Sequence, residues 1–324
     1  STSRQASIAS LTFLFEFFAE ARGSLFILSL ISIDCQMFLL AVALAHAPPR
    51  MAMHSARAHP LVLSAAAADT EAVLFRVTHT VLDVASAASF YEACFGLSMA
   101  ESTVGGGAAI LTEPLNRARA LQLELVLDAC GGFQAGGGYQ GLSARCGDVD
   151  AAVRKACAHG GAILRAAELV RHGASKVPDE AEATVTAVRQ ALVADPSGYP
   201  ILMYEAVEGG GELPLLSAVR LNVYEWKASQ DWYESNLGWS TLRWQSNVPL
   251  DPSITVTVGP RDLEAHVGPC GPTSGESAAV VQLRYEYGCD KTVQQGGLQS
   301  LALSRSGASM DMHVDPDGYP LTLA

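Results

Sequence analysis

The sequence predicts an α+β protein in which a small strand–helix–strand unit occurs twice in tandem. Residues 77–99 align without a gap with residues 219–241, which lie 142 positions further on. Both segments begin with a short strand-like run, continue into a helical stretch that carries an aromatic pair, and end in a glycine. Two nearly identical turns, DPSGYP at 195–200 and DPDGYP at 315–320, close the copies. Because self-similarity of this kind marks a duplicated structural unit, it decides the fold prediction.

The first copy is expected to open with a strand at 77–81. The helix that follows carries Phe90 and Tyr91, which we expect to pack in the core. Gly96 is expected to end this helix, because glycine readily adopts the left-handed conformation found just after helices. The later elements of this copy are predicted to be strands at 121–126 and 139–144 and a helix at 149–161.

The second copy is expected to repeat this order. Its helix carries Trp232 and Tyr233 and is expected to end at Gly238. Its strands are predicted at 219–223, 279–284 and 298–303.

The second copy is also shorter than the first. The first copy has 54 residues from Gly141 to Asp195, whereas the matching stretch from Ser300 to Asp315 has 15. The difference corresponds to a helix plus a strand. Either the second copy has lost half a module, or an exon is missing from the sequence.

The closing turns and the boundary between the copies have their own signals. In Asp-Pro-x-Gly, proline fixes φ, aspartate caps the turn, and glycine accepts a positive φ. The glycines at 209–211 are expected to form a flexible linker. The predicted division is an N-terminal region at 1–70 outside the fold, a first domain at 71–207, a linker at 208–214 and a second domain at 215–324.

The N-terminal region has the character of a targeting segment. Residues 25–45 are apolar apart from Asp34, and this stretch is long enough to span a bilayer. The run that begins at Met37 is similar to the apolar part of a signal peptide, and residues 46–68 contain Arg50 and Arg57 but no acid. We therefore expect delivery to a plastid or another organelle. The alternatives are a signal-anchored membrane protein and a misassigned extension.

Composition excludes several classes of protein. The chain of 324 residues carries 33 acidic and 21 basic side chains, a net charge of −12, which argues against nucleic acid as a partner. Its seven cysteines form no CxxC pair, which argues against a disulfide scaffold and a zinc knuckle. We expect buried, reduced thiols.

The motifs in this order resemble those of the vicinal oxygen chelate superfamily, and of glyoxalase I in particular. The resemblance rests on HTVLDV at 79–84, FYEACFGLSM at 90–99, LELV at 123–126, GDVDAAVRKACAHGGAIL at 147–164 and DPSGYP at 195–200. It implies tandem glyoxalase/bleomycin-resistance-like domains built of paired βαβββ modules, with the second domain truncated. The curved sheets of such modules enclose a metal ion and a small-molecule substrate.

The resemblance also implies a set of metal ligands. In glyoxalase I four side chains bind a divalent metal, for which Zn or Ni suits the nitrogen and oxygen donors. The ligand on the first strand matches His79, and the glutamate on a later strand matches Glu124. Gly141 and Leu202 stand at the other two positions. The second copy has Leu221, Gln282, Ser300 and Thr322 at its four positions, of which only Gln282 is even a weak ligand.

In the family, the first two ligands of one copy meet the last two of the other. His79 and Glu124 are therefore expected to face Ser300 and Thr322, while the opposite pocket has essentially no ligand set. Two interpretations of His79 and Glu124 stay open: they share a metal ion or a substrate proton, or each has only a structural role. His313 matches no family ligand position and is interpreted as a strand residue.

Two functions follow as hypotheses. The first is a metal-dependent lyase of the lactoylglutathione lyase type, which isomerises the glutathione hemithioacetal of a 2-oxoaldehyde, with Glu124 as base or ligand and glutathione as co-substrate. The second is a catalytically inactive relative that binds a small molecule or a protein partner. Both imply a monomer or homodimer that contacts a membrane only through the N-terminal segment.

Overall fold

The computed structural model describes most of the chain beyond residue 70. The described residues are 71–103, 105–113, 120–133, 138–176, 184–205, 215–248, 251–273, 278–288, 298–305 and 311–323. They belong to one compact unit, Val62–Ala324. The predicted targeting region at 1–70 and the linker at 208–214 lie outside the described residues. Within the part that is described, no helix combines the length and apolar character needed to cross a membrane.

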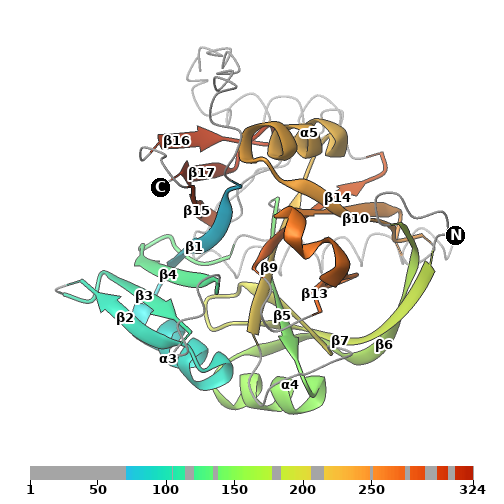
Figure 1. Ribbon diagram of the computed structural model, residues 1–324. Helices are drawn as coiled ribbons and strands as arrows, with labels where there is room; N and C mark the ends of the chain where they lie inside the picture. The colour runs from blue at the N-terminus through green and yellow to red at the C-terminus, as the bar shows by residue number, and fades with distance from the viewer. Residues whose placement is uncertain are drawn as a thin grey trace, which may run out of the picture. The chain divides into compact units, whose positions relative to one another are not determined.

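The described strands form two large sheets (Figure 1). Sheet A has the strand order β16-β17-β15-β1-β4-β3-β2, and sheet B is a closed barrel with the order β10-β11-β14-β9-β5-β8-β7-β6. The strands of sheet A are β1 (Val73–Val81), β2 (Ser98–Ser102), β3 (Ala108–Thr112), β4 (Gln122–Leu127), β15 (Leu298–Ser304), β16 (Asp311–Val314) and β17 (Pro320–Leu323). Those of sheet B are β5 (Tyr139–Cys146), β6 (Ala162–Lys176), β7 (Thr184–Ala194), β8 (Pro200–Glu205), β9 (Leu215–Asn222), β10 (Ser240–Ser246), β11 (Ser253–Gly259) and β14 (Val280–Glu286).

Helices and short elements cover and connect these sheets. The chain also forms α3 (Val84–Phe95), α4 (Val149–Ala158), α5 (Trp226–Leu237), the short 3-10 helix η2 (Arg261–His266), and the two-stranded pair β12 (Val267–Gly268) and β13 (Gly271–Pro272). This mixture of curved sheets and few helices confirms the α+β class.

The two sequence copies exchange strands. β1 of the first copy pairs in parallel with β4 and antiparallel with β15 of the second copy. Likewise, β9 of the second copy pairs in parallel with β14 of the same copy and antiparallel with β5 of the first copy. Each sheet therefore combines the first half of one copy with the second half of the other, as expected. The boundary near 208–214 separates sequence copies rather than compact bodies.

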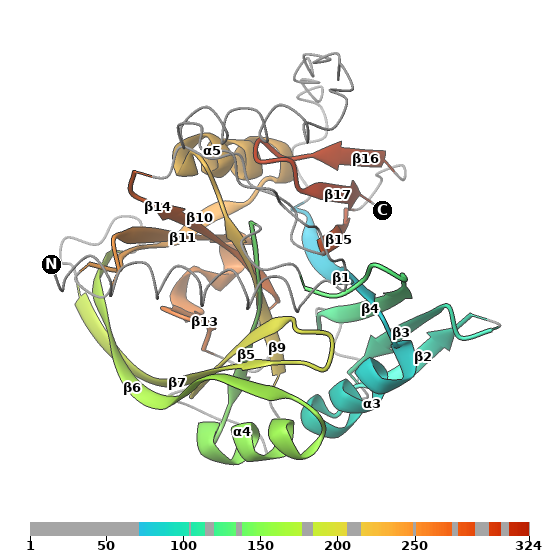
Figure 2. The same cartoon turned by 180° about the vertical axis from the view of Figure 1, so that it is seen from behind.

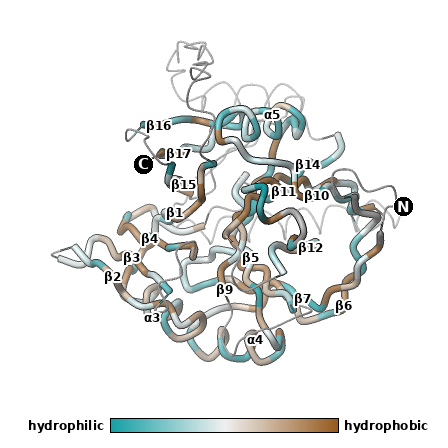
Figure 3. Tube along the Cα trace, viewed as in Figure 1, coloured by the Kyte–Doolittle hydropathy of each residue, from teal (hydrophilic) through white to brown (hydrophobic). Residues whose placement is uncertain are grey.

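The helices of the two copies end as predicted but pack differently. α3 ends at Gly96 with φ 67° and α5 at Gly238 with φ 71°, both in the left-handed region. At the start of α3, Asp83 accepts hydrogen bonds from two backbone N–H groups, whereas Glu225 makes no side-chain cap for α5. α5 is also the more hydrophilic helix (Figure 3), and its Trp232 is only half-buried.

The closing turns are tied to these helices by a tyrosine. Asp195 accepts backbone hydrogen bonds within its turn and one from Tyr91 Oη at 3.0 Å. Asp315 accepts the equivalent bond from Tyr233 Oη at 3.0 Å. Burial raises the pKa of Asp195 to about 6 and that of Asp315 to about 7. In each copy, the helix tyrosine and the turn aspartate thus form one buried hydrogen bond, which explains why both residues are repeated.

The shortened second copy lacks counterparts of α4 and β6. Only residues 305–310 separate β15 from β16, too few for a helix of the length of α4. The consequence is an asymmetry between the sheets. In sheet B the long β6–β7 hairpin curves from α4 toward β10 (Figure 2), and β6 pairs with β10 to close the barrel. Sheet A has no such closure within its described strands.

Candidate functional site

His79 lies on β1 and is completely buried. Its ring stacks on Tyr199 with 3.9 Å between ring centroids, and its Nε2 lies 2.7 Å from Tyr139 Oη. Burial lowers the pKa of His79 to about 3, so the ring is neutral at physiological pH. The surroundings of this histidine are those of a core residue.

Glu124 lies on β4 and projects from the face of sheet A opposite to that of His79. Its partner across β1 and β4 is Thr78, whose Oγ1 donates to Glu124 Oε2 at 2.9 Å. Since successive residues of a strand point to opposite faces, His79 points away from Glu124. The structure therefore does not bring the two predicted ligands together. The residue of β1 that lies beside Glu124 is Thr78, which immediately precedes His79 in the sequence.

The other residues on this face complete a closed polar row. Ser300 Oγ donates to Thr78 Oγ1 at 3.1 Å, which confirms that the second half of the second copy faces the first strand of the first copy. Arg76 Nη1 lies 4.0 Å from Glu124 Oε2. We call Arg76, Thr78, Glu124 and Ser300 the sheet A row.

The sheet A row does not fit a divalent metal. It offers one carboxylate, two hydroxyl groups and a cationic guanidinium, whereas Zn or Ni requires several nitrogen, carboxylate or thiolate donors. Among the described residues, no group of three or more His, Cys, Asp or Glu side chains could hold a metal ion. Thr322 lies opposite Ala302, which lies opposite Arg76, so its hydroxyl is on the same face as the row, as expected, and adds one more neutral oxygen there. His313 lies opposite Leu321 on β16, the edge strand of the sheet.

The equivalent row in sheet B contains Gly141, Arg220 and Gln282, which are direct neighbours across β5, β9 and β14. Gly141 has φ 95°, and a Cβ at this position would overlap the Pro200 carbonyl oxygen. No ligating side chain fits there. Gln282 Nε2 donates to the Pro269 carbonyl oxygen at 3.2 Å, which fixes the orientation of its amide. We call Gly141, Arg220 and Gln282 the sheet B row.

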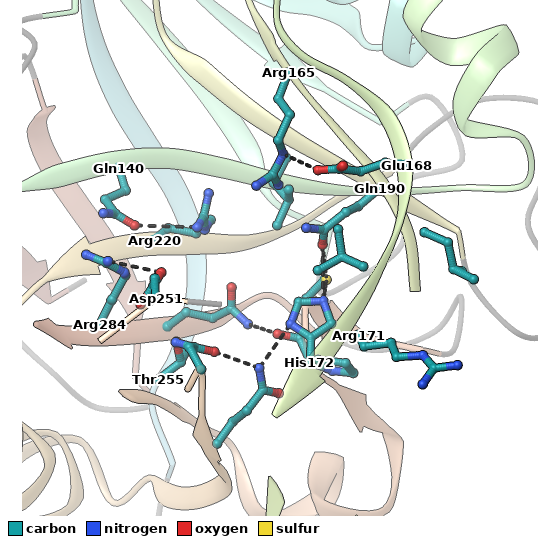
Figure 4. Close-up of a pocket in the computed structure, with 18 residues that line it drawn as sticks. Gln140, Arg165, Glu168, Arg171, His172, Gln190, Arg220, Asp251, Thr255 and Arg284 are labelled. Atoms are coloured by element: carbon teal, nitrogen blue, oxygen red, sulfur yellow. Dashed lines mark hydrogen bonds and ion pairs between the residues drawn. The ribbon is translucent and has the colours of Figure 1, made fainter. Parts of the chain in front are cut away.

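The sheet B row lies against a cavity of about 550 Å³ (Figure 4). Its wall carries both charged and amide side chains. The charged ones are Arg165, Arg171, Arg220, Arg284, Glu168 and Asp251. The amides are Gln140, Gln190, Gln245, Gln282 and Asn247. With four arginines and two carboxylates, the wall is net positive in a chain whose total charge is −12.

Two arginines of this wall have no ion pair with a described carboxylate: Arg171, which is exposed, and Arg220, which is partly buried. Arg284 pairs with Asp251 at 3.2 Å, and Arg165 pairs with Glu168 at 3.5 Å. Within the described residues, the side-chain hydrogen bond of Arg220 goes to the neutral Gln140 Oε1 at 3.4 Å. Burial lowers the pKa of Arg220 to about 10, which still leaves the guanidinium charged at neutral pH. Figure 4 shows Arg220 beside Gln140, within the ring of lining side chains.

Cys270 and His172 also meet at the cavity, with 3.5 Å between Sγ and Nε2. Burial raises the pKa of the Cys270 thiol to about 12 and lowers that of His172. The thiol is therefore protonated at neutral pH, and the pair lacks the thiolate that a nucleophilic cysteine requires.

The cavity lies in sheet B, whereas the two predicted ligands His79 and Glu124 both lie in sheet A. The family positions place Leu221 together with Gln282, but Leu221 is buried in the core and the first-strand neighbour of Gln282 is Arg220. The alternation of Val219, Arg220 and Leu221 indicates which face of the sheet the arginine occupies, although it does not indicate a cavity there. If the two apolar residues face the core, the arginine between them faces the opposite side of the sheet.

Comparisons with known proteins agree with this fold. A family model described as Glyoxalase/Bleomycin resistance protein/Dioxygenase superfamily matches residues 73–203. The crystal structure of glyoxalase I from Zea mays matches with a TM-score of 0.58 at 18% identity, covering 78% of this chain and 92% of that chain. A variant of the same maize protein matches with a TM-score of 0.59 at 19% identity, covering 79% and 92%. No curated protein sequence matches the chain.

Proposed function

We propose that the chain, of which residues 73–203 match the Glyoxalase/Bleomycin resistance protein/Dioxygenase superfamily, binds an anionic small molecule in the cavity of sheet B. The observation that carries this proposal is Arg220, a partly buried cation whose described side-chain hydrogen bond goes to a neutral amide. A desolvated guanidinium without a counter-charge is costly, and an anionic ligand would supply the missing charge.

The electrostatics of the wall support the same conclusion. The net negative charge of the chain repels anions at long range, so selective binding requires a local positive site. Arg220 provides one, since Arg165 and Arg284 are paired with carboxylates and Arg171 is exposed. The volume of about 550 Å³ falls in the range typical of small-molecule sites.

Isomerisation of the lactoylglutathione lyase type is the second candidate function. The fold similarity to maize glyoxalase I over most of that chain favours it. In this hypothesis Zn or Ni would bind and glutathione would form part of the substrate. The donor sets of both rows argue against such a metal site, because Glu124 stands as the single carboxylate of one row and Gln282 is the single amide donor of the other.

A binding experiment separates these functions. We expect the full chain to bind small carboxylates or phosphates by calorimetry without added metal, and the Arg220→Met variant to bind them roughly 10–100-fold more weakly, as for a lost charge-assisted hydrogen bond. Arg171→Met is the matched control, since Arg171 is exposed at the same cavity. Metal-dependent turnover of the methylglyoxal–glutathione hemithioacetal, undiminished in Arg220→Met, would favour the lyase instead.

A further inference from the structure

The amide groups of the cavity wall define the kind of anion that fits. Of the lining residues that the structure describes, none carries a phenyl, phenol or indole ring, so the wall can stack a flat ligand only through its guanidinium groups or the His172 ring. It offers carboxamides, each of which can both donate and accept hydrogen bonds. Their orientations are fixed by the surrounding hydrogen bonds and show which groups are left for a ligand.

One chain of hydrogen bonds begins at Asn247. Its Nδ2 donates to Ser253 Oγ at 2.9 Å and to Thr255 Oγ1 at 3.0 Å, so its Oδ1 is left to accept. Gln245 Nε2 donates to this Oδ1 at 2.9 Å and is also 3.1 Å from His172 Nδ1. Because the Gln245 amide nitrogen has only hydrogens to offer, His172 Nδ1 must accept.

The chain continues through His172 to Gln190. With Nδ1 accepting, the neutral ring carries its proton on Nε2 and donates to Gln190 Oε1 at 3.2 Å. Cys270 Sγ donates to the same oxygen at 3.2 Å. Gln190 Oε1 is thus fully used, and the Gln190 Nε2 group is left to donate into the cavity.

Two neighbouring amides are oriented in the same manner. Gln140 Oε1 accepts from Arg220, which leaves Gln140 Nε2 as a donor. Gln282 Nε2 donates to the Pro269 carbonyl, which leaves Gln282 Oε1 as an acceptor. Among the described residues neither remaining group has a partner, and neither is sealed from solvent.

From this pattern we infer that the cavity binds a hydroxylated aliphatic anion, such as a sugar acid. The anionic group pairs with Arg220, and its hydroxyl groups accept from Gln190 Nε2 and Gln140 Nε2 and donate to Gln282 Oε1. Hydroxyl groups suit this mixture because each can donate and accept. This inference rests on the proposed function of the same cavity and specifies its ligand class.

The test compares four carboxylate ligands against the full chain by calorimetry: gluconate, hexanoate, 3-phenylpropionate and S-lactoylglutathione. We expect gluconate to bind at least about tenfold more tightly than hexanoate or 3-phenylpropionate, as one or two extra hydrogen bonds would produce. In Gln282→Met, gluconate binding should weaken about tenfold while hexanoate binding stays unchanged. Gln190→Met should behave likewise, and melting temperatures establish that both variants are folded.

The outcomes separate this inference from the proposed function. If gluconate and hexanoate bind equally and both require Arg220, the ligand class is wrong but the anion site stands. Preferred binding of 3-phenylpropionate or S-lactoylglutathione also overturns the ligand class, in favour of an aromatic or a peptide-like anion. If none of the four ligands shows Arg220-dependent binding, both proposals fail.

Discussion

The two rows occupy equivalent places in the two sheets, yet one is closed and the other is open. In the sheet A row, Ser300, Thr78 and Glu124 satisfy one another through short hydrogen bonds, and Arg76 lies close to the carboxylate. In the sheet B row, Arg220 stands where the other row has Thr78, and it faces a cavity without an acidic partner. The equivalent strand positions differ at all three places: Thr78, Glu124 and Ser300 in sheet A correspond to Arg220, Gln282 and Gly141 in sheet B, so the same register yields an internal polar contact in one sheet and an arginine at a cavity in the other.

The loss of α4 and β6 from the second copy reinforces this difference. The β6–β7 hairpin supplies Arg165, Glu168, Arg171, His172 and Gln190 to the cavity wall and pairs with β10. In sheet A the short β16 corresponds to β7, and no described strand corresponds to β6. The complete module thus builds the cavity, and the shortened one leaves its row without a comparable wall in the described structure. The matched substitutions below test this comparison, beginning with the largest expected effect.

Gly141→Ala should destabilise the fold far more than Ser300→Ala, its equivalent in sheet A. The alanine Cβ overlaps the Pro200 carbonyl oxygen at a positive φ, which we expect to cost about 3 kcal/mol or more. Ser300→Ala loses one hydrogen bond, about 1 kcal/mol. Urea unfolding of both variants measures the difference, and equal effects would contradict the close backbone approach in sheet B.

His79 should make folding stability depend on pH, whereas the equivalent Leu221 cannot. The folded pKa of about 3 lies below the ordinary value of 6.5, so the unfolded chain binds the proton more readily. The stability contribution is complete above pH 6.5 and falls by about 1.4 kcal/mol per pH unit as the pH drops toward 3.

The measurement is the difference in unfolding free energy between the wild type and His79→Phe from pH 7 to pH 4.5. The raised pKa values of Asp195 and Asp315 act with the opposite sign, since their contribution is lost as the pH rises from about 4 toward 6 and 7. Both proteins share these aspartates, so their effect cancels in the difference. A difference that does not change with pH would mean that His79 is accessible to solvent.

Tyr91→Phe and Tyr233→Phe should destabilise the fold by similar amounts, about 1 kcal/mol each plus the cost of a buried carboxylate that loses a donor. The two hydrogen bonds have the same length and the same kind of partner. Thermal unfolding of the two variants tests whether the helix-to-turn contact is equivalent in both copies. A large effect of one substitution and none of the other would show that the copies have diverged here as well.

Glu124→Gln should have the smallest effect. The side chain is 27% exposed and its amide oxygen can still accept from Thr78, so we expect a loss of less than about 1 kcal/mol. Anion binding in the sheet B cavity should be unchanged. Loss of binding or of an enzymatic activity in this variant would restore sheet A as the functional site.

Much of the fold could be predicted from the sequence, because the repeat encodes it locally. A glycine directly after a helix predicts the left-handed residue that ends it, as seen at Gly96 and Gly238, and each DPxGY motif predicts a tight turn. The smaller number of residues between the strands of the second copy indicates that a helix and a strand are missing there. The site was harder to predict. The resemblance implies His79 as a ligand, but the face to which a side chain points depends on strand register, and a displacement of one residue moves it to the other face.

The cavity itself could not be predicted from local patterns. It depends on the β6–β7 hairpin reaching β10, a pairing between residues about seventy positions apart that involves only Trp244 with Lys176 and Gln245 with Ser175. Arg220 and Gln282 lie on strands that are also distant in sequence, and only their register makes them neighbours. Nothing in either strand alone distinguishes a surface arginine from a cavity arginine.

The most direct test is a crystal structure of the chain grown with bromide and examined by anomalous scattering, alongside crystals of Arg220→Met. We predict a bromide peak beside the Arg220 guanidinium within the sheet B cavity, and its absence in the variant. A peak beside Arg76 in sheet A with none at Arg220 would contradict the assignment of the site.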